Sequence, residues 1–183
     1  NDLNPDLFVV VAFSILPDRI IDIPKNGSIN IHPSLLPKYR GSSPIQYALL
    51  NGDEETGVSI INLNSKIDSG AILAQKKFSI PNSANFGYMY EKLGIMGSEL
   101  LIKVIKDIQN KKSSSIIQDE SKKTLAPKIK KEQHKIDWDQ SANQIHNQIR
   151  AFDPYPGAYA FINNKRIKLF GSKIEDVEVS SKC

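Results

Sequence analysis

The feature that most constrains the fold is the run LFVVVAF at residues 7–13, in which every side chain is apolar. An uninterrupted run that contains several β-branched residues is typical of a strand buried on both faces of a parallel sheet. The patterns that follow indicate further strands and helices, then a polar connector and a short β-rich segment. We therefore expect a three-layer α/β domain, a connector and the start of a small β domain.

The first 111 residues carry the remaining patterns of the α/β domain. Apolar runs predict strands at 28–32, 58–63 and 71–80, with a short amphipathic helix or turn at 18–23. A helix at 44–51 is predicted between the N-cap residue Ser43 and Gly52. From residue 86 to 108, apolar residues recur every three or four positions, which predicts a long amphipathic helix packed on the sheet.

The sequence changes character near residue 111. Hydrophobic periodicity is absent up to residue 131, and this lysine- and serine-rich stretch indicates a linker. Beyond it we predict a short helix around 145–152 and a β-hairpin across Asn163-Asn164, because asparagine tolerates the positive φ of such turns. The predicted division is an α/β domain that is incomplete at its N-terminus (1–111), a basic linker (112–131) and an incomplete β domain (132–183).

Composition excludes several classes of protein. No apolar run approaches the roughly 18 residues that a membrane span needs, and the chain does not open with a signal peptide. Cys183 is the single cysteine, so internal disulfides and cysteine-based zinc sites are excluded. The net charge of +4 is concentrated between Lys111 and Lys135, where eight lysines face three acids. Such a run is most often a solvated face, and it gains interest only beside an RNA-using active site.

Asn30 and His32 are the first candidates for chemistry. Residues two apart share one face of a strand, and the carboxyl ends of strands in open α/β sheets are where ligands bind. Asp68, on the loop after another predicted strand, could orient and charge the imidazole of His32. These three would then stabilise an oxyanion while a substrate amine attacks an acyl carbon directly. The alternative from Asn30 and His32 alone is a hydrogen-bonded polar pair in the core.

A specific resemblance rests on four segments in the correct order. The family of 10-formyltetrahydrofolate-dependent formyltransferases has the signatures that stand here as N-x-H-x-S-L-L-P (30–37), R-G-x-x-P-I (40–45), E-T-G-V (55–58) and D-x-G (68–70). The chain therefore resembles this family along nearly its whole length. The resemblance implies the C-terminal half of a Rossmann-like formyltransferase domain, a linker and the start of an OB-like domain. It also implies that the family's N-terminal strands and most of its second domain are absent from this chain.

The resemblance also implies site residues and substrates. Asn30, His32 and Asp68 would be the catalytic group, and 10-formyltetrahydrofolate the cosubstrate, with no metal. The folate would be contacted by residues of two segments: Ser34, Leu35, Leu36 and Pro37 in the first, and Phe13, Ile15 and Leu16 in the second. The loop before Asp68 would complete the pteridine pocket, whose walls need apolar side chains and a few polar groups.

Members of this family differ in their acceptor, which is methionyl-tRNA, glycinamide ribonucleotide, a sugar-nucleotide amine or water. The segments T-L-A-P-K-I (124–129), I-D-W (136–138) and I-R-A-F-D-P-Y-P-G-A (149–158) are similar to those of members that formylate initiator methionyl-tRNA. A tRNA backbone would also favour the lysines of the linker. A sugar-nucleotide amine is the alternative acceptor, and an RNA-binding module with a degenerate site is a third interpretation. We expect a monomer with no membrane association, in the bacterial cytoplasm or an organelle.

Overall fold

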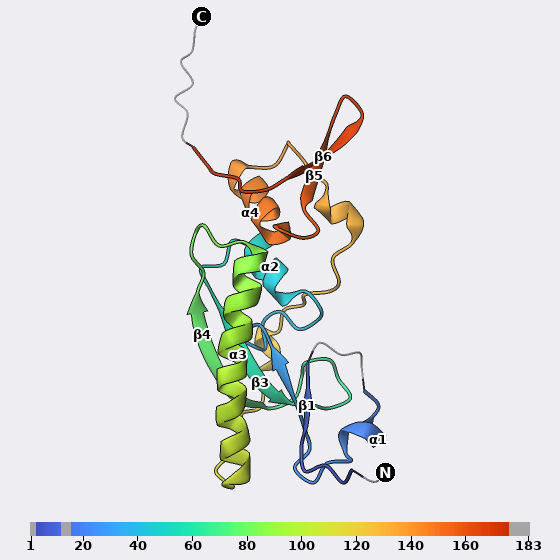
Figure 1. Ribbon diagram of the computed structural model, residues 1–183, viewed down its shortest axis with the longest axis vertical. Helices are drawn as coiled ribbons and strands as arrows, with labels where there is room; N and C mark the ends of the chain where they lie inside the picture. Colours follow the sequence, from blue (N-terminus) through green and yellow to red (C-terminus); the bar gives the residue numbers. More distant parts are fainter. Residues whose placement is uncertain (1–2, 12–15, 176–183) are drawn as a thin grey trace, which may run out of the picture.

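Four strands form one mixed sheet in the computed structural model, which describes residues 3–11 and 16–175 (Figure 1). The strands are β1 (Phe8–Val10), β2 (Ser28–His32), β3 (Glu55–Asn62) and β4 (Ile72–Ser79), paired in the order β1-β2-β3-β4. Strands β1 and β2 are parallel, whereas β2–β3 and β3–β4 are antiparallel. The predicted α/β class is confirmed, but the parallel arrangement holds for one strand pair alone among these residues.

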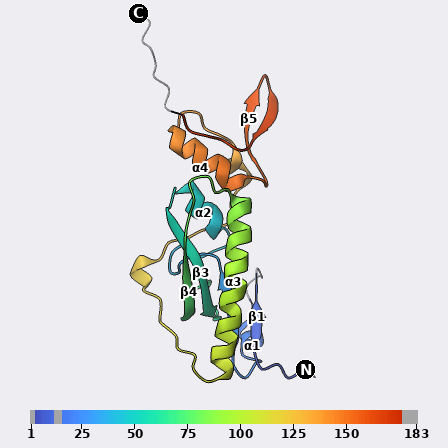
Figure 2. The same cartoon turned by 60° about the vertical axis from the view of Figure 1, so that its left-hand side comes forward.

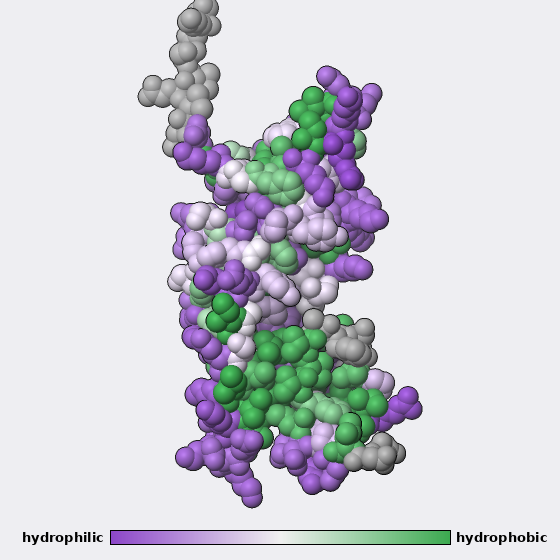
Figure 3. Space-filling model, viewed as in Figure 1, coloured by the Kyte–Doolittle hydropathy of each residue, from purple (hydrophilic) through white to green (hydrophobic). Residues whose placement is uncertain are grey.

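Strand β1 is less buried than its sequence predicts. Val9 is 39% exposed and Val11, just beyond the strand, is 58% exposed. Among the described residues β1 pairs with β2 on one side and with nothing on the other. Figure 3 shows apolar surface over this end of the molecule, where β1 and α1 (Asp18–Ile21) lie. The prediction of a strand buried on both faces is therefore wrong for this chain, because the described residues leave the face that carries Val9 and Val11 partly uncovered.

One face of the sheet is covered by the long helix α3 (Phe86–Gln109), as its periodicity predicts. Leu100 and Val104 of α3 pack with Ile60 of β3. The residue before it, Ser59, points to the opposite face of the sheet. That second face is covered by the loop after β2 and by the connector, which Figure 2 shows on the side away from α3. The sequence predicts helices on both faces of the sheet. The structure has the helix α3 on one face and irregular chain on the other.

The connector is held against the domain along much of its length. Ile116 forms an isolated bridge with Ile72 at the start of β4, and Leu125 forms a parallel bridge with Arg40. Gln118 is 5% exposed and Ala126 is fully buried. The segment also contains a 3-10 helix, η1 (Glu120–Lys122). The segment lacks hydrophobic periodicity because its backbone is irregular. It is nevertheless paired with the α/β domain and is not the freely solvated linker that the sequence predicts.

The carboxyl-terminal part contains η2 (Lys131–His134), α4 (Ala142–Phe152) and the hairpin β5 (Ala158–Ile162) and β6 (Lys165–Leu169). Ser141 caps α4 by accepting a hydrogen bond from the amide of Gln144, in a capping box. Asn163 and Asn164 have φ angles of 49° and 62°, so the predicted hairpin turn is confirmed. Two strands do not define an OB-like barrel, which stays a prediction.

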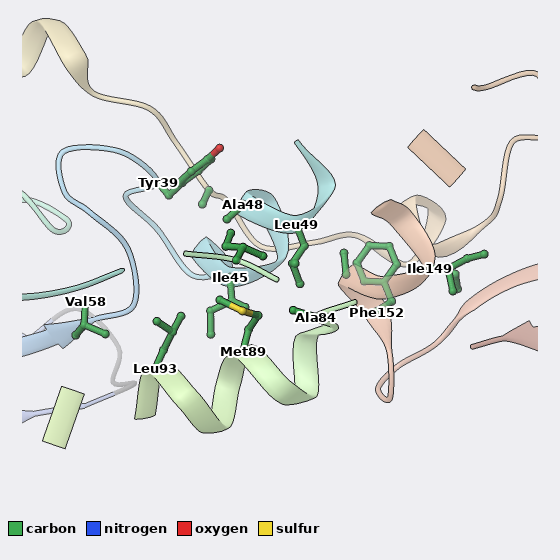
Figure 4. Packing of buried hydrophobic residues seen from close by; sticks show 14 of the residues in the cluster. Tyr39, Ile45, Ala48, Leu49, Val58, Ala84, Met89, Leu93, Ile149 and Phe152 are labelled. Atoms are coloured by element: carbon green, nitrogen blue, oxygen red, sulfur yellow. The ribbon is translucent and has the colours of Figure 1, made fainter. Parts of the chain in front are cut away.

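One hydrophobic core joins the two parts of the chain. Helix α2 (Pro44–Leu50), the N-terminal half of α3 and helix α4 converge on it, as Figure 4 shows. Its most buried large side chains include Leu49, Met89, Leu93 and Phe152. The helix packing therefore fixes the second part against the first. Within residues 3–11 and 16–175, no helix is long and apolar enough to cross a membrane.

Candidate active site

His32 lies at the carboxyl end of β2, where its side chain is 5% exposed. Its Nε2 lies 2.8 Å from the carbonyl oxygen of Tyr39, and its Nδ1 lies 3.6 Å from Oδ2 of Asp68. A carbonyl oxygen only accepts hydrogen bonds, so Nε2 carries a proton and donates a hydrogen bond to the carbonyl of Tyr39. The other ring nitrogen, Nδ1, therefore faces the carboxylate and is available for proton exchange.

The carboxylate of Asp68 is held by backbone on the loop between β3 and β4. The amide of Gly41 donates a hydrogen bond of 2.8 Å to Oδ2, the same oxygen that faces His32. Asp68 and Tyr39 both have left-handed backbone, with φ of 48° and 62°. Such conformations cost roughly 1–3 kcal/mol outside glycine and persist where the surroundings determine them. Both groups that contact the imidazole are thus fixed in strained positions.

Burial sets the charge of the resting imidazole. Removal from water lowers the pKa of His32 below its usual value, while the Asp68 carboxylate and the Tyr39 carbonyl act in the opposite direction to a smaller extent. The neutral ring, with its proton on Nε2, is therefore the favoured form of the free site at pH 7. The charge that the sequence analysis gives to His32 would have to arise when substrate or a proton from it arrives.

The lowered pKa of His32 predicts acid sensitivity. Where the folded state resists protonation and the unfolded state accepts it, the free energy of unfolding falls as pH drops through about 6.5. One such group contributes at most about 1.4 kcal/mol per pH unit. We expect urea unfolding of the wild type to lose more stability between pH 7.5 and 5.5 than His32→Gln does. Equal losses in the two proteins would contradict this burial effect.

Asn30 and Asp68 face one pocket. Its walls come from β1, β2, α1 with the residue Leu16 before it, and the loop after β3: Val10, Leu16, Ile21, Asn30, Leu63, Asn64, Ser65, Lys66, Ile67 and Asp68. Leu16 and the loop before Asp68 thus lie where the sequence analysis expects a folate pocket. Phe13 and Ile15, also expected there, lie outside the described residues. The pocket combines apolar walls with a few polar groups, as sites for flat heterocycles do.

Two family models match this chain. Residues 1–105 match the family model for formyl transferase, and residues 128–182 match the model for the formyl transferase C-terminal domain. The chain belongs to the formyl transferase family.

Several curated proteins resemble the chain along both matched regions. The methionyl-tRNA formyltransferase of Staphylococcus epidermidis (strain RP62A) is 44% identical over 173 residues, which is 94% of this chain and 56% of that protein. That of Listeria welshimeri is 43% identical over 178 residues, or 97% and 57% of the two chains. The chain therefore spans somewhat more than half the length of these relatives.

Solved structures share the fold. The 4-N formyltransferase from Francisella tularensis superposes with a TM-score of 0.78 at 27% identity, over 92% of this chain and 72% of that one. HypX from Aquifex aeolicus in complex with tetrahydrofolic acid gives 0.79 at 21% identity, over 91% and 29%. The formyl transferase fold is thus present over most of this chain.

The first segment expected to bind folate, Ser34 to Pro37, lies outside this pocket in the formyl transferase. Ser34 is fully buried, and its hydroxyl donates a hydrogen bond of 2.6 Å to the carbonyl of Lys38. Leu36 is 3% exposed, and its amide donates to the hydroxyl of Ser59. Neither these two residues nor Leu35 and Pro37 line the pocket of Asn30 and Asp68. The structure shows a loop-bracing role for Ser34 and Leu36, and their contact with folate stays a prediction.

Two backbone groups of the site have no side-chain signature in the sequence. The backbone carbonyl of Tyr39 orients His32, and the backbone amide of Gly41 orients Asp68. Every residue except proline has both backbone groups, so the residue type does not reveal these contacts. Gly41 leaves one indirect signal: a Cβ there would lie 2.4 Å from the carbonyl oxygen of Ala126. Its φ of 125° also favours glycine. Across the described parts of the chain, no group of three or more metal-binding side chains gathers.

Proposed function

We propose that the protein transfers a formyl group from 10-formyltetrahydrofolate to the amino group of initiator methionyl-tRNA, for translation initiation. The observation that carries this proposal is the match to methionyl-tRNA formyltransferases through both family regions, the second included. The arrangement of the buried His32 with the half-buried Asn30 and Asp68 supports it, because it supplies groups that acyl transfer to an amine needs.

The pocket fits the folate head group in its chemistry. Leu16, Ile21 and Leu63 offer apolar surface to a flat ring, and the polar edge of the pocket is formed by Asn30, Asn64 and Asp68. The folate supplies the formyl carbon that an acceptor amine attacks. Asn30 lines this pocket from the same strand as His32. Its side-chain amide can donate a hydrogen bond to the formyl oxygen as negative charge develops there.

Proton transfer is assigned to His32 and Asp68. An amine that attacks a carbonyl carbon becomes positively charged and must lose a proton, while the departing nitrogen must gain one. Nδ1 of His32 is free to accept this proton because Nε2 is committed to Tyr39. The carboxylate 3.6 Å away stabilises the imidazolium that results, and the proton then passes to the departing nitrogen. The His32–Asp68 pair thus acts first as the base for the attacking amine and then as the acid for the departing nitrogen.

The tRNA part of the proposal draws on charge. All eight lysines between residues 111 and 135 are exposed, although Lys122 and Lys123 are paired with Asp119 and Glu120. Exposed lysines along an ordered segment can neutralise phosphates and release counterions. Their side chains are therefore suited to a polyanionic acceptor. The bacterial relatives support placing this reaction in the bacterial cytoplasm or an organelle.

An acceptor assay with the full-length protein tests this proposal. With labelled 10-formyltetrahydrofolate, we expect formyl transfer to charged initiator methionyl-tRNA and none to a dTDP-linked amino sugar. Transfer to the sugar alone would favour the alternative acceptor. Salt-sensitive tRNA binding without any transfer would favour an RNA-binding module. Light scattering during size-exclusion chromatography measures the expected monomeric state in the same preparation.

A further inference from the structure

Gln118 of the connector is bonded directly to the loop that carries Asp68. Its side-chain Nε2 donates two hydrogen bonds of 2.8 Å, one to the backbone carbonyl of Asp68 and one to that of Gly70. The residue is 5% exposed. A connector residue 50 positions away in sequence therefore holds the main chain of a site residue.

The amide of Gln118 has a fixed orientation. Its Oε1 accepts hydrogen bonds from Nε and Nη2 of Arg40, at 3.0 and 2.7 Å. Arg40 is itself 5% exposed and its Nη2 contacts Glu120 at 2.6 Å. Because the guanidinium can only donate, the Gln118 oxygen must face it and the NH2 group must face the loop. The geometry leaves a single amide orientation.

The loop is confined from the other side as well. A Cβ at Gly70 would lie 1.6 Å from the carbonyl oxygen of Asn62, so the chain there is in direct contact with the end of β3. Hydrogen bonds from Gln118 and close packing against the end of β3 thus hold the loop on two sides, and Asp68 has its left-handed φ of 48° between these contacts. A strained residue needs such surroundings to persist.

We propose that Gln118 is a positioning residue that fixes Asp68 against His32 and so sets the proton exchange of that pair. This inference rests on the proposed function for its kinetic part alone. The hydrogen bonds from Gln118 reach the carbonyl of Asp68, whose carboxylate lies 3.6 Å from Nδ1 of His32. Displacement of the loop by a fraction of that distance changes both the interaction of the carboxylate with the ring and its alignment for proton transfer.

The chain offers a matched control in Gln148 of α4. Its Nε2 also donates to two backbone carbonyls, those of Gln133 and Lys135, at 2.7 and 2.9 Å. Gln148 is 8% exposed, so it resembles Gln118 in burial and in the two hydrogen bonds that its Nε2 donates, whereas its Oε1 has no partner among the described residues. Its two carbonyls belong to the segment around η2, which contributes nothing to the pocket or the imidazole contacts. Both alanine substitutions remove two hydrogen bonds to backbone carbonyls, and Gln118→Ala also removes an acceptor of Arg40, so it should lose at least as much thermal stability as Gln148→Ala.

The kinetic measurement separates positioning from stability. In the full-length protein we expect kcat for formyl transfer to fall about 10- to 100-fold in Gln118→Ala and to stay at the wild-type value in Gln148→Ala. Gln118→Glu keeps the size and the Arg40 acceptor but cannot donate to the loop, so it should show a similar loss and covers the case in which Gln118→Ala does not fold. Gln118 variants that lose stability but keep wild-type kcat would overturn the inference.

A measurement without substrate makes the inference independent of the acceptor. NMR titration of the His32 ring in the free protein should give a lower pKa in Gln118→Ala than in the wild type, because Asp68, which raises that pKa, moves away. Gln148→Ala should titrate as the wild type does. Identical titration in all three proteins refutes positioning by Gln118. A shifted titration in a protein that formylates no acceptor would refute the proposed function and leave the role of Gln118 intact.

Discussion

Replacing Asn30 by alanine is expected to lower kcat for formyl transfer by about 10² to 10³, the usual loss when one preorganised donor to an oxyanion is removed. Asn30 lines the pocket beside Asp68 and belongs to the same strand as His32. A water molecule in the space left by its side chain would reorganise during the reaction and recover little of this effect. Steady-state kinetics of the full-length protein, with saturating methionyl-tRNA and 10-formyltetrahydrofolate, test the proposed activity and measure the loss.

A nearby asparagine provides the control for this prediction. Asn26 is exposed and precedes β2 by two residues, so Asn26→Ala changes the same kind of side chain outside the pocket. Its kcat should equal that of the wild type. Asn30→Asp, which keeps the shape but replaces the donor by an acceptor, should be at least as slow as Asn30→Ala. Asn30→Ala with near-normal turnover and intact folding would remove this residue from the proposed chemistry.

The second large effect concerns stability. Phe152 is 1% exposed and lies in the core shared by α2, α3 and α4, as Figure 4 shows. Phe152→Ala should therefore lower the free energy of unfolding by about 3–5 kcal/mol, because it removes apolar burial and leaves a cavity. Urea titration followed by circular dichroism measures this change.

Phe161 is the matched control, because the same substitution there acts on a side chain that is 54% exposed. Phe161→Ala should cost well under half as much as Phe152→Ala. The comparison also tests whether the two parts of the chain unfold together. A single transition at a lower urea concentration is expected for Phe152→Ala, whereas loss of helix α4 in a separate early transition would show that the core does not couple them.

Local patterns predicted the α-helices and most strands, and among them the strand that carries Asn30 and His32. The alternation of Ser28–His32 placed Asn30 and His32 on one strand, and the three-to-four spacing after Phe86 gave α3. The hairpin across Asn163 and Asn164 followed from the tolerance of asparagine for positive φ. These predictions succeeded because period, capping and turn chemistry depend on residues that are close in sequence.

Features that depend on distant contacts escaped prediction. The antiparallel direction of the β2–β3 pair could not be predicted from either strand, since an apolar run suits parallel and antiparallel pairing alike. Gln118 has no periodic neighbours, and its role arises from hydrogen bonds to carbonyls about 50 residues away. The His32–Asp68 contact was inferred from the resemblance and the position of each loop, whereas the Tyr39 and Gly41 backbone groups needed coordinates.

The contact between α2 and α4 limits how such proteins can recombine. A Cβ at Gly52, just after α2, would lie 2.8 Å from the side-chain amide of Asn147 in α4, so the two helices meet closely there. A crossover between two related genes anywhere in the connector would separate this pair and the core around it. Hybrids that gain a foreign carboxyl-terminal half should therefore be more stable when α2 comes from the same parent as α4, so the two helices are expected to vary together among related proteins.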